Sequence, residues 1–311
     1  MASEPQTVVL GTTEAARPAR AIRLYATLSD YWALTKPEVN FLILVTTLAG
    51  FHLASKPSFG RFRILLAVNT LLGTMLVAGG TGTLNQFIER SFDAQMRRTA
   101  RRPLASGRIE SSQALWFGIS LSLVGTVYLA LTVNLVASLL ALVTLLTYLF
   151  LYTPLKRKTP LCTLVGAFPG AVPPLIGWAA ARGQLNPEAW VLYAIVFLWQ
   201  FPHFMAIAWM YREDYARAGY LILPWDKRRE QYVVWQSLGV SLALVPLSLI
   251  PTIIGVSGPI YLVGALVLGL IFTYHNARFA FQRSNVAARR LLAVSIIYLP
   301  AVFILLMLNK K

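Results

Sequence analysis

Nine long apolar windows constrain the fold of this chain more than any other feature of its sequence. They lie at about residues 39–55, 63–85, 113–131, 134–153, 162–181, 189–211, 232–253, 258–275 and 291–308. Each approaches the roughly 20 apolar residues that cross a bilayer core as one helix. A membrane barrel would instead show shorter segments of alternating polarity. The chain is therefore predicted to be an all-α polytopic membrane protein with about nine transmembrane helices.

The charged residues indicate how these helices are oriented. The chain has a net charge of +16, and most of its 28 Lys and Arg residues lie in the N-terminal tail and in alternate loops. The positive-inside rule places these segments in the cytoplasm. The basic character is thus mainly a topology signal and does not predict nucleic-acid binding. We expect a cytoplasmic N-terminal tail at 1–37 and a single transmembrane domain at 38–311.

Three oxygen-bearing side chains follow the second window at intervals of four residues: Asn85, Glu89 and Asp93. On a helix this spacing drifts by only about 80°, so all three share one face. Carboxylates beside lipid are costly unless they serve a site. Mg²⁺ prefers oxygen ligands and usually takes one or two carboxylates together with substrate phosphates. The spacing predicts a Mg²⁺ site, with solvated charges at a helix end as the alternative.

Basic side chains surround this motif in the sequence. Four arginines come directly after it, and a third cytoplasmic loop adds three more cations; they are Arg97, Arg98, Arg101, Arg102, Lys156, Arg157 and Lys158. Guanidinium and ammonium groups suit phosphate oxygens. A diphosphate held by metal and by these cations would be stabilised as its charge grows on departure. The alternative is that the cations only set topology.

Three further features lie in the other windows. Glu213 and Asp214 end the sixth window and would supply either a second metal ligand or a solvated helix end. His203 follows Pro202 inside an apolar window, where a histidine is expected to be a ligand, a proton carrier or a hydrogen-bonded structural residue. The prolines of the fifth window predict a kink or an irregular segment that lines a pocket.

Taken together, these motifs resemble the UbiA-type intramembrane prenyltransferases, in particular the branch that farnesylates haem b. The likeness is carried by LTKPEV, TLNQFIERSFDAQMRRTARRPL, YTPLKRKTPLCTLVGAFPGAVPPLIGWAA, WQFPHFMAIAW and YREDYARAGYLILP. It implies nine helices around a central cavity, with a diphosphate site beneath the cytoplasmic loops. It also implies Mg²⁺-assisted loss of diphosphate from farnesyl diphosphate, attack by a haem b vinyl group and addition of water, which gives haem O.

The resemblance also implies roles for individual residues. The metal–diphosphate ligands are expected at Asn85, Glu89 and Asp93, with Asp214 as a further catalytic acid. Tyr211 and Tyr215 stand where the wider family commonly has aspartates, and the second metal site is not carried over. Substrate contacts are expected at Arg98, Arg102, Lys158, His203, Tyr211, Tyr215 and Lys36. His203 matches the PHF element of the family, and a haem contact there is our own inference; for Lys36 the resemblance gives no defined role.

The implied setting is a bacterial plasma membrane, with the active-site loops in the cytoplasm and a haem A synthase or terminal oxidase that consumes the product. Two other functions remain open on the sequence. One is prenyl transfer to an aromatic acid, as in quinone synthesis. The other is transport, for which paired half-repeats and charged sites at the membrane midplane would be expected.

Overall fold

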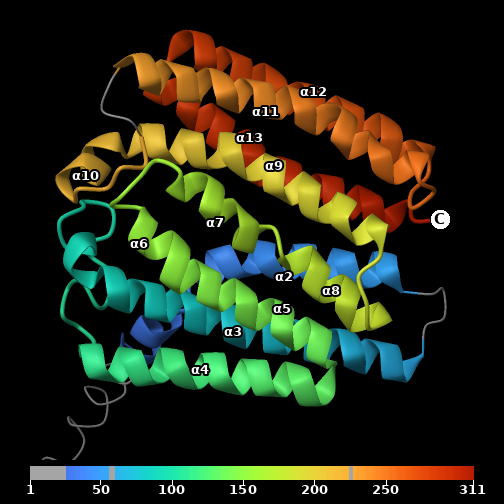
Figure 1. Cartoon of the computed structure of the whole chain (residues 1–311), viewed down its shortest axis with the longest axis horizontal. Coiled ribbons are helices and arrows are strands. Elements are labelled where there is room, and N and C mark those ends of the chain that lie inside the picture. The colour runs from blue at the N-terminus through green and yellow to red at the C-terminus, as the bar shows by residue number, and fades with distance from the viewer. Residues whose placement is uncertain (1–25, 56–59, 224–226) are drawn as a thin grey trace, which may run out of the picture.

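The structure is a computed structural model that describes residues 26–55, 60–223 and 227–311 (Figure 1). Within these ranges its regular secondary structure consists of helices, with one isolated β-bridge between Ser257 and Lys310. Residues 1–25 of the predicted tail lie outside the described ranges. The elements are α2 (Pro37–Ala54), α3 (Arg61–Asp93), α4 (Ser111–Thr132), α5 (Leu135–Leu146), η1 (Thr147–Tyr152), α6 (Thr153–Leu155), α7 (Cys162–Gly170), α8 (Pro173–Arg182), α9 (Pro187–Met210), α10 (Arg212–Arg217), α11 (Lys227–Ile253), α12 (Pro259–Gln282) and α13 (Asn285–Leu308).

The prediction of nine membrane-crossing segments is confirmed for the described chain. Nine helical segments are long and apolar enough to span a bilayer: Pro37–Ala54, Arg61–Asp93, Ser111–Thr132, Leu135–Leu155, Cys162–Arg182, Pro187–Met210, Gln231–Ile253, Pro259–Gln282 and Asn285–Leu308. The second differs most from its window, because α3 continues for 33 residues, about 50 Å. No proline interrupts it before Pro103. Its last two turns therefore carry the acidic motif beyond the apolar window.

The fifth span is irregular, as its prolines predict. It consists of two short helices, α7 and α8, which meet at Ala171 and Val172. Pro173 and Pro174 open α8, where a proline lacks only an N–H that would have no helical partner. The fourth span also departs from a regular helix, because the π-helical segment η1 joins α5 to α6.

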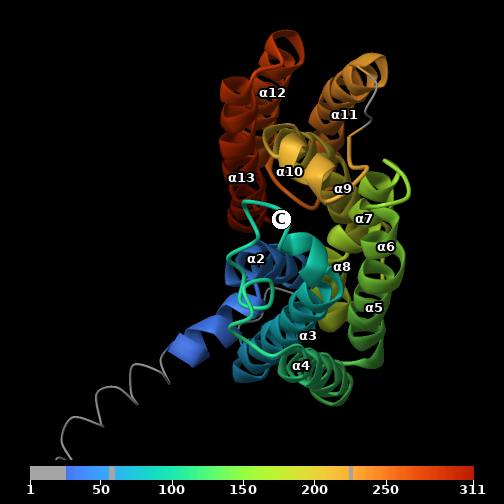
Figure 2. The same cartoon turned by 90° about the vertical axis from the view of Figure 1, so that its left-hand side faces the viewer.

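The spans pack into a closed ring. Going around it, α2 contacts α3, then α4, α5, η1, α7, α9, α11, α12 and α13 follow, and α13 returns to contact α2. The short helix α8 packs on α2, α5 and α9. Figure 2 looks onto the end of the molecule that carries α10 and the connection between α3 and α4. This ring brings segments distant in sequence to one end.

Glycine allows the closest approach within the ring, between α2 and α8. A Cβ atom on Gly177 of α8 would overlap the Thr47 carbonyl oxygen, and one on Gly50 of α2 would overlap the Pro174 carbonyl oxygen. Small residues at such contacts let helix backbones approach closely in a membrane. The contact fixes α8 against α2.

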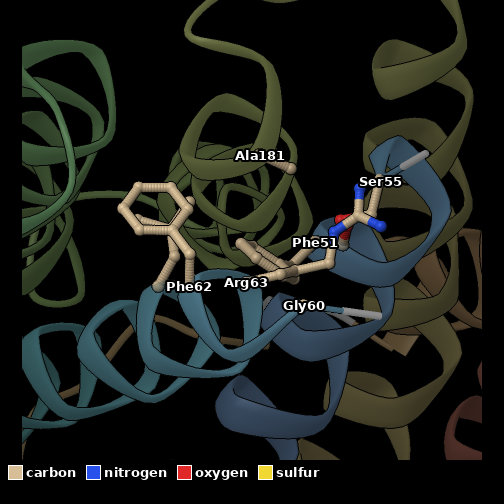
Figure 3. Close-up of a pocket in the computed structure, with 7 residues that line it drawn as sticks. Phe51, Ser55, Gly60, Phe62, Arg63 and Ala181 are labelled. Carbon is tan, nitrogen blue, oxygen red and sulfur yellow. The ribbon is translucent and has the colours of Figure 1, made fainter. Parts of the chain in front are cut away.

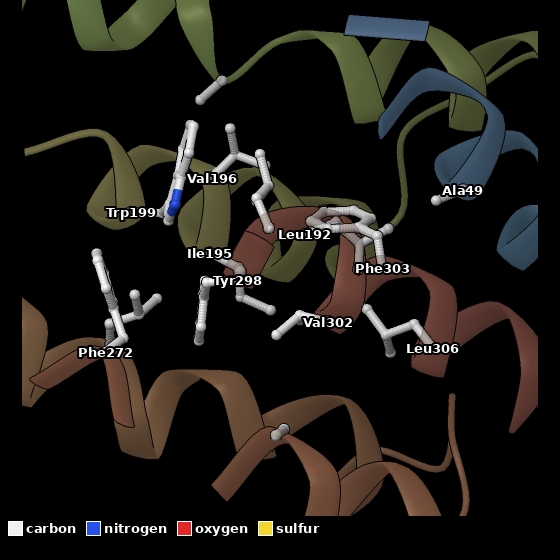
Figure 4. Packing of buried hydrophobic residues seen from close by; sticks show 14 of the residues in the cluster. Ala49, Leu192, Ile195, Val196, Trp199, Phe272, Tyr298, Val302, Phe303 and Leu306 are labelled. Carbon is white, nitrogen blue, oxygen red and sulfur yellow. The ribbon is translucent and has the colours of Figure 1, made fainter. Parts of the chain in front are cut away.

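The largest apolar core lies between α9, α12 and α13 (Figure 4). Trp199, Ile195 and Leu192 of α9 face Tyr298 and other side chains of α13. The Trp199 indole Nε1 donates to the Ser295 carbonyl oxygen of α13 at 2.9 Å. This core holds α9 in register with α13.

A short helix precedes the first span, inside the segment predicted as a tail. Residues 26–34 are helical, and Leu34 is fully buried. Leu34 packs with Leu104, Ile109 and Ala114, so this segment is attached to the connection between α3 and α4. Leu28 and Trp32 of this segment are exposed. Its apolar residues therefore do not form the continuous run that would have predicted a helix from the sequence.

Candidate active site

The acidic motif of α3 forms one buried face. Asn85, Glu89 and Asp93 retain 1%, 5% and 2% of their accessible surface. The shared face that the spacing predicts is confirmed, and we refer to these three residues as the acidic face. Three polar side chains this deeply buried require partners, since an unpaired buried carboxylate is strongly destabilising.

Each member of the acidic face is paired with a cation from a different segment. The Lys36 ammonium donates to Asn85 Oδ1 at 2.8 Å. The Lys156 ammonium lies 2.8 Å from Glu89 Oε1, and the Arg102 guanidinium lies 2.7 Å from Asp93 Oδ2. Each oxygen group thus meets a group that is itself able to bind phosphate. The predicted proximity of Lys36 and Arg102 to the site is observed.

Lys36 reaches Asn85 from the residue just before α2. Its backbone is left-handed, with φ 53°, which is uncommon for a residue other than glycine. Pro37 then opens the helix. Burial and the positive charge of Arg102 lower the pKa of Lys36 to about 7. Asn85 also donates to the Thr153 hydroxyl at 3.1 Å, which links the acidic face to α6.

The third cytoplasmic loop contributes Lys156, whereas the sequence analysis selected Lys158. Lys156 retains 8% of its surface, and its ammonium lies 4.5 Å from the centroid of the Tyr152 ring. Burial lowers the pKa of Lys156, but the Glu89 carboxylate and the neighbouring tyrosines together raise it above the usual value. Lys158 is exposed. It stands two residues further along a turn that begins at α6, and the structure leaves it outside the acidic face.

The second motif meets the loop after α3. Asp214 Oδ2 accepts a hydrogen bond from the Arg98 backbone N–H at 3.2 Å, and its Oδ1 lies 3.1 Å from the Arg217 guanidinium. The Arg98 guanidinium stacks over the Tyr211 ring at 4.8 Å and donates to the Tyr215 hydroxyl at 3.4 Å. The structure therefore brings together Arg98, Tyr211, Asp214 and Tyr215. Asp214 acts here as an anchor for the loop.

Tyr220 is a site residue that the sequence analysis missed. Its side chain is 4% exposed and packs with Met96 and Ala218. Its hydroxyl lies beside the Glu89 carboxylate, and burial and the negative charge of Glu89 raise the pKa of this phenol. Tyr220 therefore belongs to the surroundings of the acidic face. The only local sign is Gly219, whose φ of 70° turns the chain before it.

The donor set of the acidic face fits Mg²⁺. Among the described residues, no group of three or more His, Cys, Asp or Glu side chains could hold a metal ion by itself. One amide and two carboxylates on one helix face match a cation that keeps waters and takes substrate phosphates as its remaining ligands. The residues present would therefore hold the metal together with a diphosphate.

His203 lies apart from these contacts. It sits on α9, and its Nδ1 is 2.8 Å from the Ser295 hydroxyl of α13. A pocket of about 280 Å³ also lies away from the acidic face (Figure 3). It is lined by Phe51, Ser55, Gly60, Phe62, Arg63, Leu66 and Ala181. Ala181 belongs to α8, and the other six lie at the ends of α2 and α3 that are opposite the acidic face. The central cavity that the resemblance implies stays a prediction.

The arrangement of the helices matches that of known proteins. The model of the UbiA prenyltransferase family matches residues 43–304. The chain belongs to this family. Among solved structures of the same fold are a digeranylgeranylglyceryl phosphate synthase (TM-score 0.74, 19% identity, 91% of this chain and 98% of that one) and a UbiA homologue from Archaeoglobus fulgidus bound to DMAPP and Mg²⁺ (TM-score 0.65, 17% identity, 89% and 99%).

Close relatives within the family share one name. A protoheme IX farnesyltransferase from Solibacter usitatus is 49% identical over 287 residues, which cover 90% of this chain and 98% of the relative. Proteins of the same name from Salinibacter ruber and Koribacter versatilis are 42% and 41% identical, over 90% and 91% of this chain and 98% and 94% of their own. This family member is an integral membrane protein with nine apolar spans in its described residues.

Proposed function

We propose that this chain transfers a farnesyl group from farnesyl diphosphate to a vinyl group of haem b, with addition of water, to give haem O and diphosphate. Its membership of the UbiA family and its 49% identity to a protoheme IX farnesyltransferase support the reaction class and the acceptor. The relatives at 38–49% identity carry that name, which disfavours an aromatic acid as acceptor.

One observation carries the proposal at atomic level. Each oxygen side chain of the acidic face is paired with its own cation, Lys36, Lys156 or Arg102. A site for diphosphate with a metal needs both sets of groups. Transport is disfavoured, because the acids gather at one end of the ring, whereas an ion pathway needs them near the midplane.

Asn85, Glu89 and Asp93 would hold Mg²⁺. The metal would polarise the diphosphate oxygens and stabilise the charge that develops on the leaving group. Side chains of the protein would bind the diphosphate of the donor directly. Lys36, Lys156 and Arg102 would turn from the acidic face to the phosphate oxygens and neutralise the departing diphosphate.

Water is the one further reactant that the remaining steps need. The C1–O bond of the donor breaks, and the diphosphate leaves with the electron pair. The vinyl carbon of haem then bonds to C1, and water adds to the carbon next to the macrocycle and releases a proton. The apolar walls of the ring exclude further water from the allylic carbon, which protects it from hydrolysis.

The first test uses the detergent-purified protein with haem b and farnesyl diphosphate, with and without Mg²⁺. We expect mass spectrometry to detect farnesylated, hydrated haem only when Mg²⁺ is present. A folded protein that binds haem but farnesylates hydroxybenzoate instead would refute the proposed acceptor. A product formed equally well in excess chelator would refute the metal site.

We further propose that the protein lies in a bacterial plasma membrane with the acidic face toward the cytoplasm. The distribution of Lys and Arg along the chain supports this orientation. Consumption of the product by a haem A synthase or terminal oxidase stays a prediction from the family resemblance.

A further inference from the structure

The hydrogen bonds around His203 fix which of its ring nitrogens carries the proton. Ser295 Oγ lies 2.8 Å from His203 Nδ1 and 2.6 Å from the Leu292 carbonyl oxygen. A serine hydroxyl has one proton, a carbonyl oxygen has none, and two oxygens 2.6 Å apart need a proton between them. The Ser295 proton therefore goes to Leu292, and His203 Nδ1–H donates to Ser295. The neutral ring then carries its lone pair on Nε2.

The ring is held in one orientation. It stacks on Trp199 with centroids 4.8 Å apart at 26°, and Phe204 meets it edge-on at 5.7 Å. Trp199 is itself fixed by its hydrogen bond to the Ser295 carbonyl oxygen. Both His203 and its neighbour are therefore anchored to the same residue of α13.

The Nε2 atom is left available. Within the described residues no hydrogen bond to it is present, and it is not among the fully buried atoms that lack a partner. His203 itself is only partly buried, although it lies inside a span. A purely structural histidine would use both nitrogens, because an unpaired polar atom away from water is costly. A lone pair presented by a neutral imidazole is the usual ligand for a metal.

His203 also lies at the depth of the acidic face. It stands seven residues before Met210, the end of α9, or about 10 Å below that end. Asn85 stands eight residues before Asp93, the end of α3, or about 12 Å below. The two helix ends are at the same level, because Arg98 and Asp214, just beyond them, share a hydrogen bond.

We propose that His203 binds the iron of the substrate haem through Nε2. This inference rests on the proposed function, which supplies haem as the substrate. Imidazole is a common axial ligand of haem iron, and metal-binding histidines donate their other N–H to a partner that orients the ring, here Ser295. The lone pair of Nε2 forms the bond to iron, with no change in oxidation state. The bond would hold the macrocycle at the depth where the acidic face begins.

The test compares two ligands that differ only in the iron. Purified protein is titrated with haem b and with metal-free protoporphyrin IX, without farnesyl diphosphate, and the Soret band is followed. We expect His203→Ala to weaken haem binding and to change its spectrum, while protoporphyrin binding is unaffected. Ser295→Ala, which removes the orienting partner, should weaken haem binding by about tenfold. His275→Ala on α12 is the matched control and should bind haem as the unsubstituted protein does.

Two results would overturn the inference. One is an unchanged haem affinity and spectrum in His203→Ala, and the other is an equal loss of haem and protoporphyrin, which would make His203 a packing residue. A second measurement uses the unsubstituted protein, so that a misfolded variant cannot affect the result.

Resonance Raman spectra of the ferrous haem-loaded protein should show an iron–histidine stretch, and its absence counts against the bond. If the unsubstituted protein makes the product but the iron–histidine stretch and the effect of His203→Ala are both missing, only this inference fails. If both are present but no product forms, the proposed reaction fails.

Discussion

At the residue scale, the acidic face depends on three oxygen–cation pairs, of which Asp93 with Arg102 has the shortest separation. Asp93→Asn keeps the shape but removes a proposed metal ligand and a negative charge. We expect turnover to fall by about 10²- to 10³-fold, as when one stabilising group is lost from the transition state. The matched control is Asp30→Asn, which breaks another Asp–Arg pair, with Arg108 at 3.0 Å, and should retain turnover. Near-normal product from Asp93→Asn would contradict the metal assignment.

The structure places Lys156 beside Glu89, whereas the family resemblance selected Lys158, and substitution of each lysine distinguishes the two assignments. Lys156→Met leaves Glu89 buried without its partner, so we expect a loss of about 3 kcal/mol in stability as well as loss of product. Lys158→Met removes an exposed charge and should change neither. Both variants are compared by thermal unfolding in detergent and by product yield. A larger loss of product from Lys158→Met would restore the assignment made from the family resemblance.

Residue spacing predicted the acidic face but not its partners. Asn85, Glu89 and Asp93 lie on one helix, where the direction of each side chain follows from its position in the sequence. Lys156 and Tyr220 lie in short turns, and the direction of their side chains depends on what packs against those turns. The choice between Lys156 and Lys158 was therefore not available from the sequence.

At the element scale, the contact between α2 and α8 depends on Gly177. Gly177→Ala would place a methyl group against the Thr47 carbonyl oxygen, and we expect a destabilisation of about 1–3 kcal/mol from overpacking. Gly239→Ala in α11 is the matched control, because a Cβ there meets nothing within 4 Å. Thermal unfolding of both variants in the same detergent tests this prediction. Equal midpoints would contradict it and would show that α8 can shift from α2 without loss of stability.

The spans themselves were predictable because hydropathy determines them directly. The windows missed what packing determines: the last turns of α3, the π-helical segment η1 and the helix at 26–34. The break in the fifth span was indicated by its prolines, since proline has a fixed effect on a helix wherever it occurs.

At the scale of the whole molecule, the predicted orientation can be measured directly. Cys162 is buried, so an introduced cysteine reports on its own position. Ser106→Cys, in the loop after α3, should react with a membrane-impermeant thiol reagent only in inverted vesicles. Gln184→Cys, after α8, should react only in right-side-out vesicles. Both positions are exposed, and the opposite pattern would place the acidic face outside the cell.

The closure of the ring by α13 against α2 has a consequence for biogenesis. The first span contacts the last, and the Lys310 ammonium reaches back to the His52 carbonyl oxygen at 2.7 Å. These contacts join residues 258 positions apart, so they cannot form until α13 has been synthesised. The side of α2 that packs on α13 therefore stays without this contact in the membrane until α13 is inserted. The order of synthesis makes the seam between α2 and α13 the last contact of the described ring to form.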